Sequence, residues 1–257
     1  MSKKLSLVWL YPDLMNTYGD RGNVLILQSR AARLGLELDV TEVTVDEKKH
    51  AEYTAAIASA DLFFMGGAQD AQQEIVVRDL TKERRTILAR KITDGTPGLY
   101  ICGAYQLLGK EYVSADGVQM PGLGVFDCVT TSPDTATEQR LIGDLIIETE
   151  FFGSAMRLYG FENHGGRTVL GETAQPLGRV VRGWGNDGGK QDEGIVLAHS
   201  IGSYMHGCML SKNPIVADWL LLHAADRKNI QVSSDLPPTG LLEALSIDVL
   251  EHRYGLR

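Results

Sequence analysis

A cysteine in residues 99–109 has the setting of a nucleophile on a sharp strand-to-helix turn. Cys102 ends the short apolar run 98–101, and the small residues Gly103 and Ala104 follow it directly. Small neighbours let such a turn close, so that the side chain is lifted above the sheet edge. A helix N-terminus also lowers a thiol pKa and offers free backbone N–H groups to an oxyanion. A buried cysteine that merely ends a strand is equally consistent with this local sequence.

A glycine pair occupies a similar place earlier in the chain. Gly66 and Gly67 follow a predicted strand at 61–65 and precede a helical pattern. The carboxyl ends of parallel strands meet at one edge of an open α/β sheet, which is where ligands bind. We therefore expect this loop to lie near Cys102 and to offer a second N–H to an oxyanion. An ordinary strand–helix turn would look the same.

A cysteine nucleophile needs a base, and histidine is the usual one. The six histidines stand at positions 50, 164, 199, 206, 223 and 252. Four of them fall in a charged stretch, on predicted helices or in a turn between strands. His206 and His164 remain, each beside a glycine and near the end of a predicted strand. We favour His206, on a loop before the Asn213-Pro214 helix start, with His164 as the second choice.

Alternating strands and helices must position these residues. The apolar spacing predicts strands at 5–10, 36–43, 61–65 and 98–101, and helices at 22–35 and 69–92. This alternation predicts βαβ units and a parallel sheet.

The second half of the chain changes character. Short alternating runs and turn signals at 112–182 predict antiparallel strands and hairpins inserted into the same domain, and the glycine-rich segment 183–189 predicts a flexible surface loop. Further strands and two helices are predicted at 195–198, 201–205, 214–229 and 241–252. Asn213 is the predicted capping residue of the first of these helices. We predict one domain over 1–232, with a linker and a C-terminal helix packed on it over 233–257.

Composition limits the class of protein. The 257 residues are 44% hydrophobic and 23% charged, as in an ordinary globular chain. The net charge of −8 argues against a nucleic-acid binder, and no apolar run is long enough to span a membrane. Three scattered cysteines predict a reduced, cytoplasmic protein rather than a disulfide framework. The sequence contains no GxxxxGK[ST] motif, and we predict no metal site, so ATP binding is expected elsewhere.

Several segments together resemble the class I glutamine amidotransferases. The class-wide pattern is Cys102-Gly103-x-x-Gln106 after a strand, with a distant Tyr204-x-His206-Gly207 loop. The chain is most similar to the cobyric-acid-synthase-like branch, and within it to the glutaminase subunits of bacterial lipid II isoglutaminyl synthase. The segments that carry this narrower resemblance are 11–23, 66–70, 101–106, 140–144, 160–166, 204–207 and 212–214.

The resemblance implies a flavodoxin-like three-layer α/β fold, with a mostly parallel central sheet and extra antiparallel strands. It implies that Cys102 attacks the side-chain amide of L-glutamine to form a thioester. His206 would act as the base and then protonate the leaving ammonia. The backbone N–H groups of Gly67 and Gly103 would hold the oxyanion.

Arg140 and Gln106 match substrate-binding positions of the family, and a guanidinium suits a carboxylate. Two positions depart from the class. Ala104 stands where glycine is common, which adds one methyl group to the turn. Cys208 stands two residues after His206, where the class usually has a glutamate that orients the imidazole.

The source of that third carboxylate is left open by the sequence. The resemblance implies that a Mur-ligase-like partner, the MurT subunit, supplies it, so that this chain alone is a weak glutaminase. Glu162 or Asp192 of this chain are the alternatives.

The resemblance also implies a heterodimer that serves peptidoglycan synthesis. The partner would use ATP and Mg²⁺ to activate the D-glutamate α-carboxyl of the lipid II stem peptide, and ammonia from this chain would convert it to D-isoglutamine. No cofactor is expected in this chain, because the partner would use the ATP and Mg²⁺. The rival hypotheses are amidation of cobyrinate type and a catalytically inactive amidotransferase fold used for interaction.

Overall fold

The computed structural model describes residues 3–133, 139–233 and 236–256. Its central sheet has the strand order β13-β14-β4-β3-β1-β2. The parallel strands are β1 (Lys4–Leu10), β2 (Glu37–Val43), β3 (Leu62–Met65), β4 (Gly98–Ile101) and β14 (Ser200–Ser203); β13 (Ile195–Leu197) is an antiparallel edge strand. β3 and β4 are buried along their whole length, as expected for parallel strands covered on both faces.

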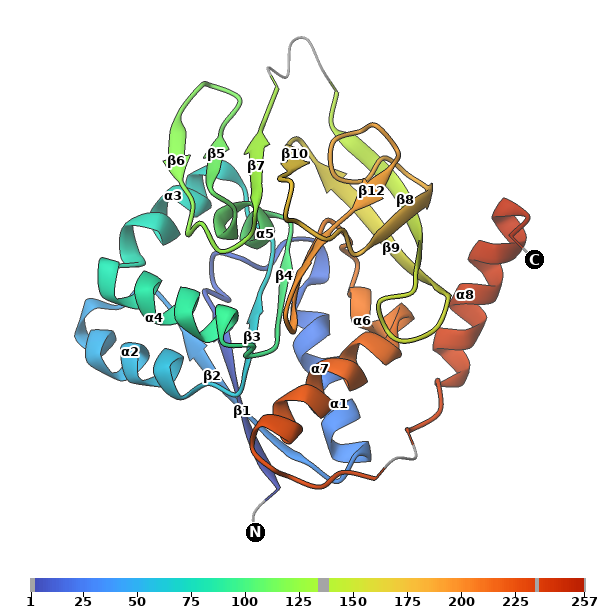
Figure 1. Cartoon of the computed structure of the whole chain (residues 1–257), viewed down its shortest axis with the longest axis horizontal. Coiled ribbons are helices and arrows are strands. Elements are labelled where there is room, and N and C mark those ends of the chain that lie inside the picture. Colours follow the sequence, from blue (N-terminus) through green and yellow to red (C-terminus); the bar gives the residue numbers. More distant parts are fainter. Residues whose placement is uncertain (1–2, 134–138, 234–235, 257) are drawn as a thin grey trace.

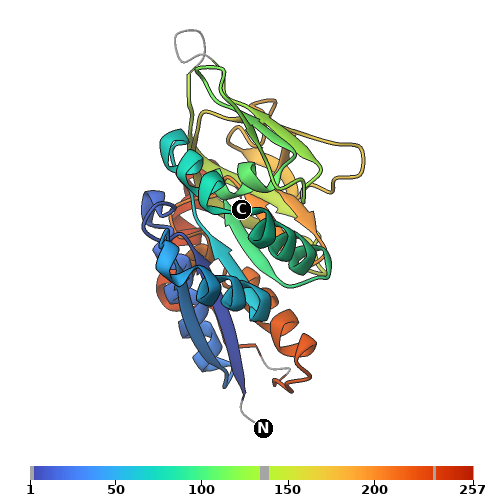
Figure 2. The ribbon, with the colours of Figure 1, turned by 90° about the vertical axis from the view of Figure 1, so that its left-hand side faces the viewer.

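Helices cover both faces of this sheet (Figure 1). α1 (Arg21–Arg33) and α7 (Pro214–Arg227) pack together on one face. α2 (His50–Ser59) and α4 (Lys82–Thr93) pack side by side on the other (Figure 2). The predicted three-layer α/β fold with a mostly parallel sheet is therefore confirmed.

Two smaller sheets lie over the carboxyl edge of the parallel strands (Figure 1). One contains β5 (Glu111–Val113), β6 (Gln119–Pro121), β7 (Cys128–Thr131) and β10 (Arg167–Leu170). The other contains β8 (Leu141–Thr149), β9 (Met156–His164), β11 (Gly178–Arg182) and β12 (Asp192–Glu193). The predicted insertion of antiparallel strands is confirmed, although β5 and β7 run parallel.

The helix predicted at 69–92 is interrupted, so that prediction was wrong. The segment forms α3 (Asp70–Asp79) and then α4, and the Thr81 side chain accepts a hydrogen bond from the Arg84 N–H to cap α4. The buried Arg84 guanidinium also binds Asp79 Oδ2 at 2.6 Å. The interruption thus allows an ion pair between the end of one helix and the start of the next.

Three local features differ from expectation. α2 was not predicted, because it buries only Tyr53 and Ile57 and its apolar periodicity is weak. The backbone N–H groups of residues 184 and 185 donate to the Glu162 carboxylate, which ties the predicted flexible loop to β9. The Asn213 side chain bonds the backbone of Tyr159 instead of capping α7.

The C-terminal helix α8 (Leu241–Tyr254) packs beside β8 and β9. The Tyr159 hydroxyl donates to Glu251 at 2.6 Å, and Leu250 forms a small apolar cluster with Ile146 and Tyr159. These contacts attach the helix to the inserted sheet. The division at residue 232 stays a prediction.

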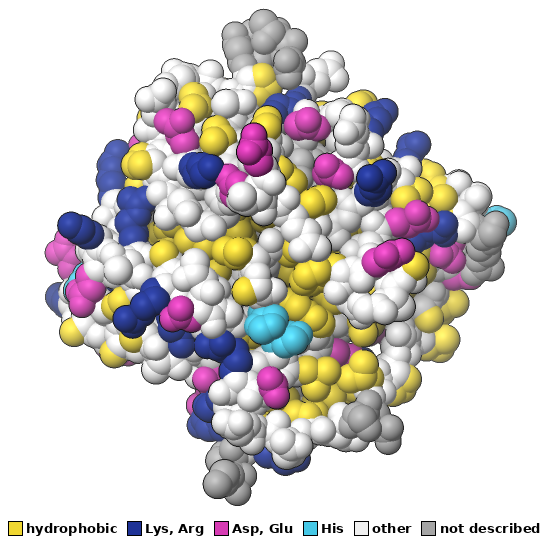
Figure 3. All heavy atoms as spheres, in the orientation of Figure 1, with side chains coloured by type: hydrophobic (Ala, Val, Ile, Leu, Met, Phe, Trp, Pro, Cys, Tyr) yellow, Lys and Arg dark blue, Asp and Glu magenta, His cyan; other side chains and the backbone are white. Residues whose placement is uncertain are grey.

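The surface carries both signs of charge. On the face shown in Figure 3, Lys and Arg side chains are interspersed with Asp and Glu and do not gather into one basic patch. Within the described ranges, none of the helices is long and apolar enough to cross a membrane.

Candidate active site

Cys102 lies on the turn between β4 and α5 (Gly103–Leu108), at the carboxyl edge of the central sheet. Its φ of +51° and ψ of −104° are strained for a residue with a side chain. The turn is held because the Cys102 N–H donates to Ser203 O of the neighbouring strand β14 at 2.8 Å. A Cβ on Gly103 would lie 2.9 Å from Ala68 N, so a small residue is needed there. Ala104 fits, fully buried, in the same turn.

His206 lies on the loop between β14 and α6 (Met209–Lys212) and is fully buried. Its backbone is fixed by a pair of hydrogen bonds with Phe161 of β9, at 2.7 and 3.3 Å. Burial alone would lower the pKa of His206, but the nearby Cys102 thiolate and the Asp20 carboxylate outweigh burial and raise it to about 10. The fold thus brings together the residues predicted as nucleophile and base.

Asp20 binds the other side of the imidazole, and the sequence analysis did not single it out. Its Oδ1 lies 3.2 Å from Nδ1 of His206, and both side chains are fully buried. Asp20 lies in the connection from β1 to α1, directly after the short helix η1 (Thr17–Gly19). Asp20 could have been identified from its position after the first parallel strand, since such connections meet at the sheet edge that carries Cys102.

The two acids considered as alternatives bind elsewhere. Glu162 accepts the N–H groups of 184–185 and lies 3.5 Å from Nε2 of His164. Burial raises the pKa of Glu162 to about 7. Asp192 is a partly exposed residue of β12. Among the described residues, the carboxylate that contacts His206 is therefore that of Asp20, not that of Glu162 or Asp192.

The second-choice base, His164, lies in a different setting. Its ring stacks on Tyr204 with centroids 3.6 Å apart, and its Nδ1 lies 2.8 Å from Gly166 O. Burial lowers the pKa of His164 to about 3, so it is neutral at neutral pH. The structure thus favours His206, rather than His164, as the partner of Cys102.

The two predicted oxyanion donors lie at the same sheet edge. A Cβ on Gly67 would lie 2.6 Å from Cε1 of His206 and 2.5 Å from Oγ1 of Thr17, so only glycine fits. The Gly67 N–H already donates to Oδ2 of Asp20 at 2.7 Å. Gly103 begins α5, where backbone N–H groups have no partner within the helix. Gly67 could therefore serve an oxyanion only by leaving Asp20.

A cavity of about 520 Å³ contains Cys102 in its wall. The polar side chains of its lining include Thr17, Tyr18, Asp70, Gln106, Arg140 and Asn163. Arg140 donates to the side-chain and backbone oxygens of Asn163 at 2.8 and 2.7 Å, which orients its guanidinium. Gln106 accepts a hydrogen bond from Gln73 at 3.0 Å. Both predicted substrate-binding residues thus line the cavity of the cysteine.

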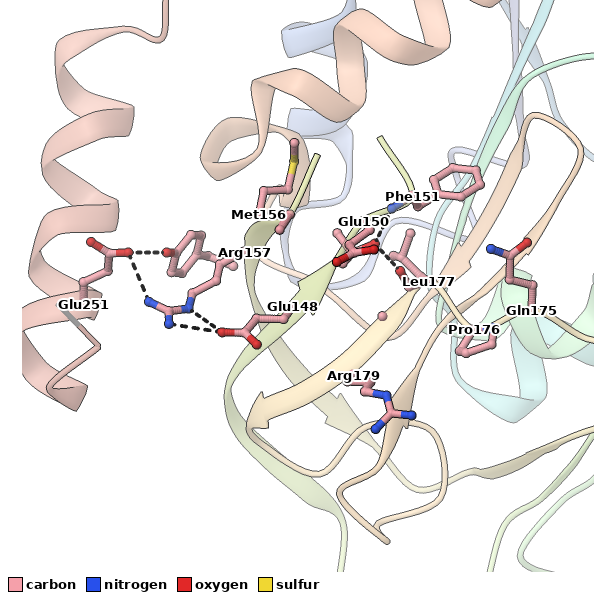
Figure 4. Close-up of a pocket in the computed structure, with 14 residues that line it drawn as sticks. Glu148, Glu150, Phe151, Met156, Arg157, Gln175, Pro176, Leu177, Arg179 and Glu251 are labelled. Carbon is pink, nitrogen blue, oxygen red and sulfur yellow. Dashed lines mark hydrogen bonds and ion pairs between the residues drawn. The ribbon is translucent and has the colours of Figure 1, made fainter. Parts of the chain in front are cut away.

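A larger cavity, of about 880 Å³, lies between α8 and the β8–β9–β11 sheet (Figure 4). Arg157 donates to Glu148 at 3.1 Å and lies 3.8 Å from Glu251 of α8, so charges in its wall pair with one another. No residue of the cysteine site lines it. The smaller cavity, which is lined by Cys102, Gln106 and Arg140, is therefore the candidate active site.

Solved structures share this fold at low sequence identity. PurLQS from Thermotoga maritima superposes with a TM-score of 0.57 at 13% identity, covering 89% of this chain and all of that one. The glutaminase domain of Trypanosoma brucei CTPS with bound acivicin gives a TM-score of 0.54 at 10% identity, covering 91% of this chain and 96% of that one. At such identities the likeness concerns the fold alone.

Closer similarity is found among sequences. The GatD subunit of lipid II isoglutaminyl synthase (glutamine-hydrolyzing) is 38% identical in Staphylococcus aureus, over 88% of this chain and 87% of that subunit. The Streptococcus pneumoniae GatD subunit is 41% identical, over 88% and 82%. A cobyric acid synthase of Pelotomaculum thermopropionicum is 31% identical over 59% of this chain but only 30% of its own length. A profile of the CobB/CobQ-like glutamine amidotransferase domain matches residues 6–214. The chain therefore belongs to the CobB/CobQ-like glutamine amidotransferase family.

Proposed function

We propose that this chain is the glutaminase subunit of a lipid II isoglutaminyl synthase, and that it hydrolyses L-glutamine to glutamate and ammonia. The observation that carries this proposal is the strained turn that sets Cys102 beside buried His206. Cys102 also lines one cavity with Arg140 and Gln106. The two GatD relatives, which match over most of both chains, favour this substrate over other amides.

The first half of the reaction forms a thioester. The Cys102 thiolate attacks the side-chain carbonyl carbon of glutamine, and the negative oxygen that develops is held by the Gly103 N–H. The C–N bond then breaks as His206 donates its proton to the departing nitrogen, which leaves as ammonia. A raised pKa suits this role, because the imidazolium carries its proton at neutral pH.

The second half releases glutamate. Neutral His206 takes a proton from water, and the resulting hydroxide adds to the thioester carbonyl. The C–S bond breaks, glutamate leaves, and the thiolate–imidazolium pair is restored. Arg140 supports both halves by holding the substrate α-carboxylate, for which its oriented guanidinium is suited.

The ammonia is consumed by a partner. We assign the partner to the Mur-ligase-like MurT class, which uses ATP and Mg²⁺ to activate the D-glutamate α-carboxyl of the lipid II stem peptide. The complex would be a cytoplasmic heterodimer, and this chain would carry no cofactor of its own. The GatD names support a subunit of such an enzyme, since each describes one part of a glutamine-hydrolysing synthase.

Two rival functions remain for comparison. Amidation of cobyrinate type is suggested by the cobyric acid synthases, but this chain spans only about a third of those proteins. An inactive interaction module is disfavoured by the retention of both Cys102 and His206.

The direct test measures glutamate release from L-glutamine by the full chain, with and without a Mur-ligase-like subunit from the same genome. Lipid II amidation by the complex is followed with glutamine or with ammonium as the nitrogen source. We expect Cys102→Ser to abolish glutamate release and glutamine-dependent amidation while ammonium-dependent amidation persists.

Each rival predicts a different outcome. Amidation of a cobyrinate carboxylate and not of lipid II would favour the first. Failure of a glutamine-analogue electrophile to modify Cys102, together with no glutamate release by the complex, would favour the inactive module and contradict the proposed glutaminase.

A further inference from the structure

We propose that Asp70 binds the α-ammonium group of the substrate, so that the site selects a free L-α-amino acid amide rather than any primary amide. This inference rests on the proposed glutaminase function and concerns what that site recognises. Asp70 is the first residue of α3, directly after the glycine loop, and it lines the cavity that contains Cys102. The reaction steps assigned to Cys102 and His206 do not use it.

The charges of the cavity wall match those of an α-amino acid. Its described part contains one guanidinium and one carboxylate, those of Arg140 and Asp70. The two residues come from segments on either side of α5, since Asp70 begins α3 and Arg140 directly precedes β8 (Figure 1). L-Glutamine carries a carboxylate and an ammonium on its α-carbon. When Arg140 holds the carboxylate, Asp70 is the group of opposite charge that is left for the ammonium.

The Asp70 carboxylate is oriented but not neutralised. The Tyr112 hydroxyl donates to its Oδ1 at 2.7 Å. Burial and this contact raise the pKa of Tyr112, so the phenol keeps the proton that it donates. Within the described ranges, no lysine or arginine side chain pairs with Asp70, which is half-buried. A carboxylate that is fixed at one oxygen and lacks a cation suits a cationic group of the ligand.

Other side-chain oxygens in the same wall are already bound. Oδ1 of Asn163 accepts from Arg140 at 2.8 Å, and Oε1 of Gln106 accepts from the Gln73 amide at 3.0 Å. Both are neutral amide oxygens, and a hydrogen bond between two charged groups is stronger than one to a neutral acceptor. Asp70 is therefore the better partner for an ammonium in this cavity.

Three separate contacts would then fix the substrate. Cys102 meets the side-chain amide, Arg140 the α-carboxylate and Asp70 the α-ammonium, and the three residues belong to different segments of the chain. Glutamine inside a peptide has an acylated, uncharged α-nitrogen and so cannot make the third contact. The site should consequently hydrolyse free glutamine and spare glutaminyl side chains of peptides.

The test compares ammonia release from L-glutamine and from glutaramate, which is glutamine without its α-amino group. It uses the full chain in complex with a Mur-ligase-like subunit from the same genome. Asp70→Asn keeps the size of the side chain and an acceptor for Tyr112 but loses the charge. We expect it to lower kcat/KM for glutamine by roughly tenfold to a hundredfold, mainly through KM, and to leave kcat/KM for glutaramate nearly unchanged. Arg140→Gln should lower kcat/KM for both substrates, since both carry the carboxylate.

A second measurement covers slow turnover of glutaramate. L-Glutamate and glutarate differ by the same α-amino group, and their inhibition constants against glutamine hydrolysis give the same comparison. Wild-type enzyme should bind glutamate more tightly than glutarate. In Asp70→Asn this preference should shrink by the factor that is lost in kcat/KM.

Two control variants separate substrate binding from the architecture of the site. Tyr112→Phe removes the hydrogen bond to Asp70 but keeps the carboxylate, so it should reduce the preference for glutamine less than Asp70→Asn does. Glu74→Gln removes a carboxylate of the same helix that does not line the cavity and pairs with Arg78 at 3.1 Å. This variant should match the wild type.

Distinct results would overturn the inference. Equal losses for glutamine and glutaramate in Asp70→Asn would mean that Asp70 shapes the site without touching the ammonium. Unchanged kinetics with glutamine in this variant, or a wild type that treats both substrates alike, would show that Asp70 does not select the ammonium. Absence of ammonia release from glutamine by the wild-type complex would instead remove the proposed function, and this inference with it.

Discussion

Two buried histidines lie near each other at the candidate active site, and their environments shift their pKa values in opposite directions. Burial disfavours the charged form of both. His206 nevertheless has a pKa raised to about 10, because the Cys102 thiolate and Asp20 face it. The pKa of His164 falls to about 3, because burial lowers it, nearby arginines lower it further, and the hydrogen bond to the Gly166 carbonyl raises it too little to compensate. The facing charges, rather than depth, decide which imidazole can exchange protons in catalysis.

The largest expected effect comes from replacing each histidine with asparagine. His206→Asn should lower kcat by roughly a thousandfold, because it removes the proton carrier. His164→Asn should keep most of the activity, since its ring is neutral and stacked on Tyr204. Steady-state glutamate release measures both. Equal losses in the two variants would break the distinction drawn between them.

Two glycines, Gly67 beside the His206 ring and Gly165 next to His164 in sequence, should give the next largest difference. A Cβ on Gly67 would lie 2.6 Å from Cε1 of His206, so Gly67→Ala must displace the imidazole and should lower kcat by roughly a hundredfold. A Cβ on Gly165 would meet Ser132 Oγ at 3.1 Å and the Arg140 guanidinium at 3.6 Å. Gly165→Ala should therefore act mainly on KM. A normal kcat in Gly67→Ala would show that the loop yields easily.

The smallest effect concerns stability against pH, and it has opposite signs for the two residues. The pKa of His164 is depressed when folded, so its contribution to stability is complete above pH 6.5 and is lost as pH falls toward 3. The pKa of His206 is raised, so its contribution is complete below pH 6.5 and is lost as pH rises through 10.

Urea midpoints at pH 4, 7 and 10 separate these contributions. His164→Asn should lose less stability than the wild type between pH 7 and 4. His206→Asn should lose less than the wild type between pH 7 and 10. Parallel curves for all three proteins would contradict the two assigned pKa shifts.

The regular parts of the fold were predictable because their signals are local. The strand at 98–101 was predicted with the bounds that β4 has, and its apolar run is buried along its length. The interruption between α3 and α4 was missed, because a buried Arg84–Asp79 pair does not alter the apolar spacing that predicts helices. α2 was missed for a related reason, since only Tyr53 and Ile57 face the core.

Part of the candidate site was equally local. Cys102 and the small residues after it predict a sharp strand-to-helix turn, and the turn in the structure has the strained backbone expected there. Asp20 was overlooked because an acid before a helix is common and its partner lies 186 positions away. The two acids that were considered lie nearer to His206 in sequence, yet their contacts are made elsewhere.

By itself, the sequence determined the parallel α/β architecture, the family and the candidate pair of residues for acyl transfer, because each is encoded in short patterns. Only the tertiary structure decided which carboxylate faces His206, which histidine carries a charge and which N–H of the glycine loop is already engaged. These depend on buried charges only a few ångströms apart. The balance between the desolvation of these charges and their mutual attraction arises only when segments that are distant in sequence meet at the sheet edge.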